Sequence, residues 1–397
     1  MCDVPALRFP EFSGEWEKLR LSDFATKITK KNKGNIVKNV LCNSANLGLV
    51  PQGNYFDREI ANTENTDGYY VICNGDFVYN PRKSTAAPFG PVNIYEGEDA
   101  GIISPLYLCF SVHNIFPKFL YYRFKSSAWH SYVYSHGDSG VRFDRVSIKD
   151  DVFFDMPIYK PAQDEQIKIA TLLQLIDDRI STQNKIIEKY ESLIQAIIYK
   201  AKMDGISKGT WRRIDLCKVL QERNEKNVDG RTICSVSVSQ GVVNQIEYLG
   251  RSFAAKQTSH YNIVKYGDIV YTKSPTGDFP YGIIKRSDIR EDVAVSPLYG
   301  VYIPASDSVG VILHFYFMQP SNAFNYLYPL IQKGAKNTIN ITNGRFLENS
   351  VPLPISKSEA NTIAGILKTI QAKIEIEKNL LQSYTKEKEY LLRQMFI

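Results

Sequence analysis

The sequence predicts an α+β protein with two repeated mixed α/β domains, separated by a long antiparallel two-helix coiled coil and related by approximate two-fold symmetry. Three observations lead to this prediction. Short landmark segments occur twice in the same order, and each copy ends in a long stretch with heptad spacing. Between these features, runs of Tyr, Val and Ile are broken by Gly, Pro, Asn and Asp, which is typical of short strands joined by turns.

Five landmark segments define the repeat. SPLY begins at Ser104 and again at Ser296, and GDFVYN at Gly75 corresponds to GDIVYT at Gly267. The other pairs are GEWEKLRL with GTWRRIDL, MPI with LPI, and IATLLQLI with IAGILKTI. All of them keep their order at offsets of 192 to 197 residues. Ordered matches of this kind are not expected by chance, so the chain is predicted to be a duplication.

Each copy is predicted to contain the same series of elements. It opens with a Trp-containing turn and a short amphipathic segment, and a β-rich part follows in which Gly75 and Gly267 mark turns that lead into strands. An aromatic helical stretch comes next, and a Gly-containing loop then leads into a strand end marked by Pro. The opening segments are 16–28 and 211–221, and the helical stretches are 116–129 and 311–328.

A long helix closes each copy. Its apolar residues recur in steps of four and three, the a/d spacing of a coiled coil, although Gln183 and Glu377 interrupt equivalent places and Lys388 interrupts the second helix again. Each helix would be about 60 Å long and, with one narrow apolar stripe, would need a partner. An ordinary structural hairpin is one interpretation; a spacer between two domains is favoured, because the helices are longer than core packing requires. The predicted seam is Ile169, Leu173, Ile176, Ile180, Ile187, Tyr190, Ile194 and Ile197 in the first helix, and Ile363, Leu367, Ile370, Ile374, Leu381, Tyr384, Leu391 and Met395 in the second.

The predicted domain boundaries follow from the repeat. A first domain occupies 1–160, a central helix 161–202, a second domain 203–357 and a C-terminal helix 358–397. With 397 residues, each domain is large enough to bury a core of its own. Residues 203–210, MDGISKGT, are predicted to form a short turn-rich link into the second copy.

Composition narrows the class of protein. The net charge of +6 and pI near 8.7 are compatible with nucleic-acid binding without establishing it. No apolar run approaches the roughly 18 residues of a membrane helix, and the N-terminus lacks a signal-peptide pattern, so a cytoplasmic protein is expected. The cysteines form no C-x-x-C pair and lie near no histidine at ligand spacing, which favours reduced structural cysteines and no metal.

The start of the first long helix carries a family resemblance. The stretch QDEQIKIATLLQLIDDRI, together with the two-fold repeat and the prolines Pro157 and Pro161, resembles the specificity subunits of type I restriction–modification systems. The resemblance spans essentially the whole chain. In the second copy Glu359 fits the pattern, but Ala360 and Gln371 depart from it. The residues that fit in the first copy are Glu165, Gln166, Ile169, Leu173, Asp177 and Ile180.

This resemblance implies a function and partners. The domains at 1–160 and 203–357 would be target recognition domains, each reading one half of a split double-stranded DNA site, and the helices would fix the gap between the halves. Two methyltransferase subunits would dock on the helices and methylate adenine with S-adenosylmethionine. Two restriction subunits could join them and cleave DNA with ATP and magnesium. The chain itself would bind no cofactor and would not be an enzyme.

Catalytic motifs are absent from the sequence. There is no Gly-Lys dipeptide and hence no P-loop. Asn80-Pro81-Arg82 is the nearest approach to the Asn-Pro-Pro-aromatic signature of adenine methylases, and it lacks the second Pro and the aromatic residue. Asp164 and Glu165 faintly resemble a nuclease site, but acidic residues at a helix start are better explained by the helix dipole.

Three clusters in the first copy are candidates for DNA contact, each with a counterpart in the second. Cations are needed for phosphates, and loops supply side chains of suitable shape for base edges. A solvated charged face, a simple turn and a plain connecting loop remain the respective alternatives. The first cluster is Lys27, Lys30, Lys31 and Lys33, and its counterpart in the second copy is Arg223 and Lys226. The second is Tyr79, Asn80, Arg82, Lys83, Ser84 and Thr85, with Tyr271, Lys273, Ser274 and Thr276. The third contains His136, Ser139 and Arg142, with Lys333, Lys336 and Asn337.

The two copies differ strongly in these loops while they share their framework, so an asymmetric bipartite site is predicted. Two other classes of protein compete with this interpretation. One is a coiled-coil scaffold whose globular domains bind proteins instead of DNA. The other is an independent enzyme such as a fused methyltransferase, which the missing cofactor motifs disfavour.

Overall fold

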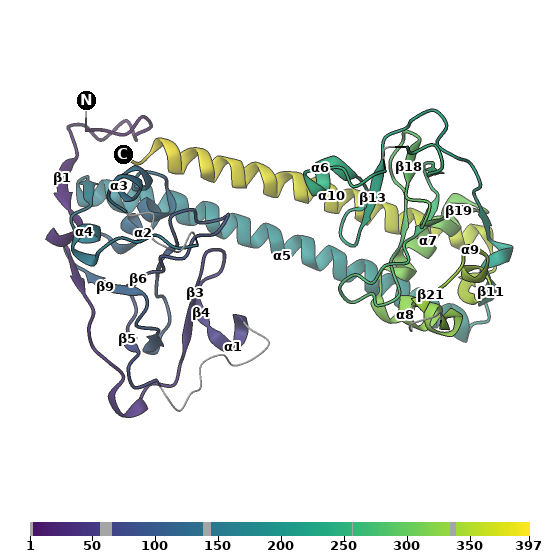
Figure 1. The fold of residues 1–397 in the computed structure, drawn as a ribbon, viewed down its shortest axis with the longest axis horizontal. Helices are drawn as coiled ribbons and strands as arrows, with labels where there is room; N and C mark the ends of the chain where they lie inside the picture. The colour runs from purple at the N-terminus through teal and green to yellow at the C-terminus, as the bar shows by residue number, and fades with distance from the viewer. Residues whose placement is uncertain (1–2, 56–65, 138–143, 256, 334–338) are drawn as a thin grey trace. The chain divides into compact units, whose positions relative to one another are not determined.

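The computed structural model describes residues 3–55, 66–137, 144–255, 257–333 and 339–397. The chain forms two compact units: unit 1 comprises 1–183 and 380–397, and unit 2 comprises 184–379. Two long helices, α5 (Gln163–Ser207) and α10 (Lys357–Gln394), each contribute to both units and are uninterrupted (Figure 1). Each compact unit therefore contains one globular domain together with parts of both helices.

Unit 1 is built around a four-stranded antiparallel sheet in the order β2-β9-β6-β7. Three antiparallel strand pairs surround it, and the first of them joins the N-terminal strand to the strand that precedes α5. The sheet strands are β2 (Ala25–Lys27), β6 (Phe77–Tyr79), β7 (Val92–Ile94) and β9 (Leu108–Val112); the pairs are β1 (Glu17–Arg20) with β10 (Pro157–Lys160), β3 (Leu41–Ser44) with β4 (Gly48–Pro51), and β5 (Tyr70–Ile72) with β8 (Gly101–Ile103). The short helices are α1 (Gln52–Tyr55), α2 (Pro117–Lys125), α3 (His130–His136) and α4 (Asp150–Phe154).

Unit 2 repeats this topology. Its four-stranded sheet has the order β12-β19-β16-β17, which matches the order in unit 1 strand for strand. The duplication predicted from the landmark segments is therefore confirmed. The sheet strands are β12 (Leu220–Glu222), β16 (Ile269–Tyr271), β17 (Ile284–Arg286) and β19 (Gly300–Pro304); the pairs are β11 (Trp211–Asp215) with β22 (Ser350–Pro354), β13 (Cys234–Ser237) with β14 (Gly241–Asn244), β15 (Asn262–Val264) with β18 (Val293–Val295), and β20 (Gln332–Lys333) with β21 (Ile339–Asn340). The short helices are α6 (Gln245–Leu249), α7 (Asp307–Phe317), α8 (Pro320–Leu327) and α9 (Asn343–Phe346).

The first long helix ends later than predicted. The turn-rich link expected at 203–210 is wrong for its first five residues, because α5 continues to Ser207. Gly205 lies inside this last turn, and a Cβ atom there would fall 1.9 Å from the Trp211 ring. The glycine thus lets the ring pack directly against the helix, and that packing offsets its poor helix propensity.

Most positions of the predicted seam are buried or half-buried, and Ile169 and Leu173 pack into the core of unit 1. Ile169, Leu173, Ile187 and Ile194 are buried on α5, and five of the predicted positions between Ile363 and Leu391 are buried on α10. One position needs correction, because Ile198 is 1% exposed whereas Ile197 is only half-buried. Where α5 and α10 meet within unit 1, Asp177 pairs with Lys388 and Arg179 donates to Tyr384, so the helices run antiparallel there.

A buried carboxylate ties the start of α5 to the N-terminal segment. Glu165 is 1% exposed and receives two hydrogen bonds from Arg8, at 2.7 and 2.8 Å, and one from Trp16 Nε1 at 3.3 Å. In unit 2, Glu359 at the start of α10 accepts from Trp211 Nε1 at 2.8 Å and from the Thr210 hydroxyl. These glutamates therefore do more than favour the helix dipole, since each fixes a tryptophan that begins its copy.

Gln166 completes the attachment in unit 1. Its Oε1 accepts from the backbone N–H of Phe116 at 2.8 Å, and its Nε2 donates to the carbonyl of Pro161 at 2.7 Å. A buried amide is favourable only when its hydrogen bonds are made, and both ends of this one are used. Ala360 stands at the equivalent place in unit 2 and cannot make these bonds.

Unit 2 also contains a buried lysine. Lys285 in β17 is 4% exposed, its ammonium group forms no hydrogen bond or ion pair with another described residue, and it lines a cavity of about 1110 Å³. Burial lowers the pKa of Lys285 from 10.5 to about 8. The pKa of Lys285 is lower in the folded chain than in the unfolded chain. As pH falls from 10.5 to about 8, the unfolded chain therefore takes up the proton before the folded chain does. This lysine therefore weakens unit 2 across that window and at every lower pH.

We expect Lys285→Met to raise the unfolding free energy at pH 7 by about 2–3 kcal/mol, because the neutral side chain has no charge to desolvate. The gain should shrink above pH 8 and vanish near pH 10.5. Chemical denaturation at several pH values measures it. The exposed Lys200→Met on α5 serves as the control and should change stability by less than about 0.5 kcal/mol at any pH; an equal gain at pH 7 and pH 10.5 would contradict the explanation.

Candidate nucleic-acid interface

Two loops of unit 1 that the sequence analysis singled out lie side by side. The backbone N–H of Lys83 donates to Asp144 at 2.8 Å, and that of Val146 donates to Pro81 at 2.8 Å. Between these bonds, Arg82 and Arg145 form a β-bridge. The loop of the second candidate cluster therefore lies beside residues 144–146, which follow the third cluster in the sequence.

The base of the first of these loops, residues 80–90, has the same construction in both units. The hydroxyl of buried Tyr79 donates to the Phe89 carbonyl at 3.0 Å, and Tyr271 donates to Tyr281 at 2.9 Å. Gly90 closes the loop with φ +84°, and a Cβ atom there would lie 2.1 Å from the Asn80 carbonyl oxygen. Gly282 closes the 272–282 loop in the same way, with φ +96° and 1.8 Å to the Thr272 oxygen. Both positions accept only glycine without rearrangement.

This construction corrects three of the predicted DNA contacts. The side chains of Tyr79 and Tyr271 are 2% and 1% exposed, and burial raises the pKa of both hydroxyls. Each packs against a phenylalanine of its own core, Tyr79 on Phe153 and Tyr271 on Phe346. Asn80 is also buried, and its Oδ1 accepts from the backbone of Arg82. These side chains shape the loop and cannot face DNA.

A cleft of about 570 Å³ opens beside the paired loops of unit 1. Lys27 from the first cluster lines it together with Arg145, Tyr70 and Leu106. Tyr70 is bridged to Lys31, a second member of that cluster. The structure thus brings Lys27 and Lys31 of the first cluster, the base of the 80–90 loop and Arg145 to one surface.

Two cations, Lys27 and Arg145, and one carboxylate, Asp150, line this cleft. Lys27 is paired with Asp150 at 2.6 Å, a hydrogen bond that raises the pKa of Lys27. Arg82 is exposed, and neither Arg82 nor Arg145 forms an ion pair with a described residue. Burial raises the pKa of the neighbouring Tyr107 hydroxyl, and the charges of Arg145 and Arg82 oppose that rise. Unpaired guanidinium groups beside a cleft favour an anionic ligand. Also exposed are Lys30, Lys31, Lys33, Lys83, Ser84, Thr85 and His136.

The equivalent surface of unit 2 has a different set of side chains. Glu222 stands where unit 1 has Lys27, and it accepts from Asn343 at 2.6 Å where Lys27 meets Asp150. Lys273 is half-buried, and burial lowers its pKa. Lys226 donates to Asn262 at 2.5 Å. In the 272–282 loop, Ser274 and Thr276 are exposed. The two units thus share a framework but carry different charged side chains, which supports two different ligand surfaces.

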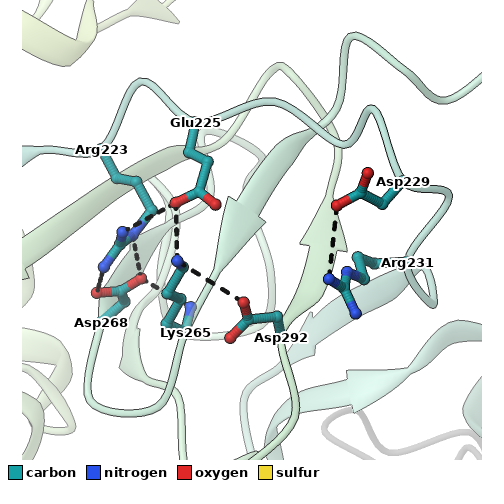
Figure 2. Close-up of polar contacts among 7 residues, drawn as sticks. All are labelled: Arg223, Glu225, Asp229, Arg231, Lys265, Asp268 and Asp292. Atoms are coloured by element: carbon teal, nitrogen blue, oxygen red, sulfur yellow. Dashed lines mark hydrogen bonds and ion pairs between the residues drawn. The ribbon is translucent and has the colours of Figure 1, made fainter.

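Arg223 belongs to an internal ion-pair network, shown in Figure 2. Its guanidinium donates to both oxygens of Asp268 at 2.7 and 3.0 Å, and Asp268 is 2% exposed. Glu225 lies between Arg223 and Lys265, which also approaches Asp292. The carboxylates in this group outnumber the cations, and the charge of Arg223 is already used inside the protein, which disfavours the predicted phosphate contact.

We expect Arg223→Ala to lower the unfolding free energy by about 2–3 kcal/mol, because Asp268 would remain buried without its cation. DNA affinity of the variant, measured on the folded fraction, should stay within about twofold of the parent. The exposed Arg212→Ala on β11 removes the same charge and should leave stability nearly unchanged. A loss of DNA affinity at unchanged stability would restore the original prediction.

Several predicted residues lie outside what the structure describes. Ser139, Arg142, Lys336 and Asn337 are outside the described residues, and for Lys333 in β20 the structure describes only the backbone. The sequence analysis also missed Arg145, although it follows Arg142 by three residues and continues the same basic stretch. Its pairing with Arg82, 63 residues earlier in the chain, left no local signal.

The described residues offer neither a metal site nor a membrane span. They contain no group of three or more His, Cys, Asp or Glu side chains placed to hold a metal ion. No helix among them combines the length and apolar character needed to cross a bilayer.

Comparison with known proteins identifies the fold. No family model matches the chain, and no curated protein matches it. Among solved structures, the S subunit of a type I restriction–modification system from M. genitalium matches with a TM-score of 0.60 and 14% identity, over 99% of each chain. A structure from work on assembly and conformational transition of a type I system matches with a TM-score of 0.50 and 13% identity, over 96% of this chain and 97% of that one. The chain therefore has the fold of the S subunit of a type I restriction–modification system.

Proposed function

We propose that this chain is the DNA-binding specificity subunit of a type I restriction–modification complex and recognises an asymmetric bipartite site. The observation that carries the proposal is that Lys27 and Arg145, far apart in the sequence, line one cleft in unit 1, and that Arg82 is bridged to Arg145 beside it. The likeness of the fold to that of an S subunit supports the proposal. Cations at this density are suited to phosphates, and arginines on rigidly based loops are suited to base edges.

The asymmetry of the proposed site rests on the two loop surfaces. The framework bonds of the 80–90 and 272–282 loops recur, whereas Arg82 and Lys83 in the first correspond to Ser274 and Pro275 in the second. Side chains with different hydrogen-bonding groups read different base edges, so each unit would recognise its own half of the site. A palindromic site would require matching side chains in both.

The proposal assigns the chemistry to partner subunits. The chain would be non-catalytic and would hold no cofactor of its own. Two methyltransferase subunits using S-adenosylmethionine would dock on it, and restriction subunits using ATP and magnesium could join them. The paired helices would serve as the spacer between the two reading units. A protein-binding scaffold, the competing class, gives no reason for unpaired arginines beside a cleft.

Methylome sequencing of cells with and without this chain tests the proposal. We expect a split motif with two different halves whose adenine methylation disappears when the chain is removed. The same data give the gap between the halves. An unchanged methylome, together with no salt-dependent duplex binding by the chain and its methyltransferase partner, would overturn the proposal in favour of a scaffold.

A further inference from the structure

Each unit contains one tight turn with the same four residues and the same hydrogen bonds. In the 104–107 turn, the backbone N–H of Tyr107 donates to the Ser104 carbonyl at 3.1 Å, and that of Leu106 donates to the Ser104 hydroxyl at 3.4 Å. The corresponding bonds in the 296–299 turn measure 3.0 and 3.3 Å. Proline at the second position restricts the turn further. The backbone of the third residue is thus held firmly in both units.

That third residue is an exposed leucine. Leu106 is 67% exposed and Leu298 is 71% exposed. Burying a leucine side chain is worth about 2 kcal/mol, so a leucine left in water forgoes that gain. The turn bonds use only backbone atoms and the serine hydroxyl, and a polar residue would keep them. The turn therefore does not explain a leucine that recurs in both copies while nearby loops differ.

Cationic side chains lie near both turns, two at Leu106 and one at Leu298. Leu106 lines the 570 Å³ cleft of unit 1 together with Lys27 and Arg145. In unit 2, Lys226 donates to Asn262, whose amide donates to the Tyr299 carbonyl at 2.9 Å, next to Leu298. These cations attract a phosphate backbone and repel a basic protein surface, so DNA is the better fit for what covers these leucines.

We infer that Leu106 and Leu298 each contact the C5-methyl group of a thymine in the half-site that their unit reads. The inference rests on the proposed function and adds to it a specificity contact in each unit. The thymine methyl is the apolar feature of the major-groove edge, and leucine is its chemical complement. About a third of Leu106 is covered in the folded chain, which suits contact with a base edge better than insertion between stacked bases.

Uracil scanning tests this contact, because uracil differs from thymine by that methyl group alone. Once the split motif is known, each thymine of the duplex is replaced singly by uracil. Binding to the chain in complex with its methyltransferase partner is then measured for the parent and for Leu106→Ala and Leu298→Ala. We expect one uracil per half-site to weaken parent binding by about fivefold, and the matching leucine variant to lose about as much on the thymine duplex. The loss of binding caused by uracil and the loss caused by the leucine variant should not add when both changes are present.

Leu47→Ala is the matched control. Leu47 is 61% exposed and also lies in a turn held by a serine hydroxyl, but its cleft is lined by Glu96, Glu98 and Asp99. This variant should bind all duplexes within about twofold of the parent. Leu106→Met, which keeps an apolar side chain, should retain the sensitivity to uracil.

Three outcomes would overturn the inference. Leucine variants could bind DNA like the control, their losses could add to every uracil loss, or they could lose the methyltransferase partner while DNA binding persists. In the first two cases, selective binding of the split motif by the parent would leave the proposed function standing.

Discussion

Replacing Arg82 and Arg145 together by alanine should weaken binding to the cognate DNA site by about 30- to 100-fold near 150 mM salt. Neither guanidinium has a carboxylate partner among the described residues, and the β-bridge between the two residues places them on adjacent strands of chain beside the unit 1 cleft. No buried acid loses its partner when they are removed. The effect should therefore appear in affinity and leave stability nearly unchanged.

The salt dependence of binding identifies what the two arginines touch. Each lost phosphate contact lowers the slope of log K against log salt by about 0.9, whereas a lost base contact relaxes sequence preference in one half-site. Fluorescence anisotropy with duplexes altered in one half at a time separates these effects. Lys18→Ala with Arg20→Ala on β1 removes the same charge at residues that do not line the cleft and should cost less than about threefold. Equal losses for both double variants would show that net charge alone governs binding.

Glu165→Gln should lower the unfolding free energy by about 2–4 kcal/mol, the second large effect that we expect. The carboxylate is 1% exposed and receives both donors of Arg8 as well as Trp16, so the neutral amide cannot serve all of them. Glu359→Gln should cost about 1 kcal/mol, since the donors it loses from Thr210 and Trp211 are uncharged.

Glu11→Gln is the control for this prediction. Glu11 forms an exposed ion pair with Lys168, which lies on α5 as Glu165 does. Exposed pairs contribute little, and its loss should be below about 0.5 kcal/mol. Thermal and urea unfolding measure all three variants. If Glu165→Gln and Glu11→Gln were equally mild, the attachment of α5 to the N-terminal segment would depend on packing of Trp16 and not on the buried carboxylate.

Periodicity and internal repetition predicted the architecture well, because both are properties of the sequence itself. Heptad spacing located the seam to within one residue, as Ile198 in place of Ile197 illustrates. The SPLY and GDFVY landmarks located equivalent turns and strands. Gly205 was misread as part of a linker since the packing of Trp211 against it depends on a contact made after the chain folds back.

The candidate interface was harder to predict, because residue type alone does not tell whether a charge or ring is already used. Tyr79 looked like a loop residue but belongs to the core, and Arg223 looked free until Asp268, 45 residues later, occupied both of its donors. Arg145 was missed for the opposite reason. Its importance comes from pairing with Arg82, and that pairing is a property of the fold.

The closure of the 80–90 and 272–282 loops has a consequence for how recognition can change over time. Gly90 and Gly282, with the tyrosine hydroxyl bonds beneath them, fasten both ends of each loop without using the exposed side chains between. Residues in that interval can be exchanged while folding free energy changes little, since exposed positions contribute weakly to stability. The exposed residues of each loop can therefore be replaced as a set. A new DNA preference can arise from a few substitutions there, while the anchoring residues at the base of the loop stay the same.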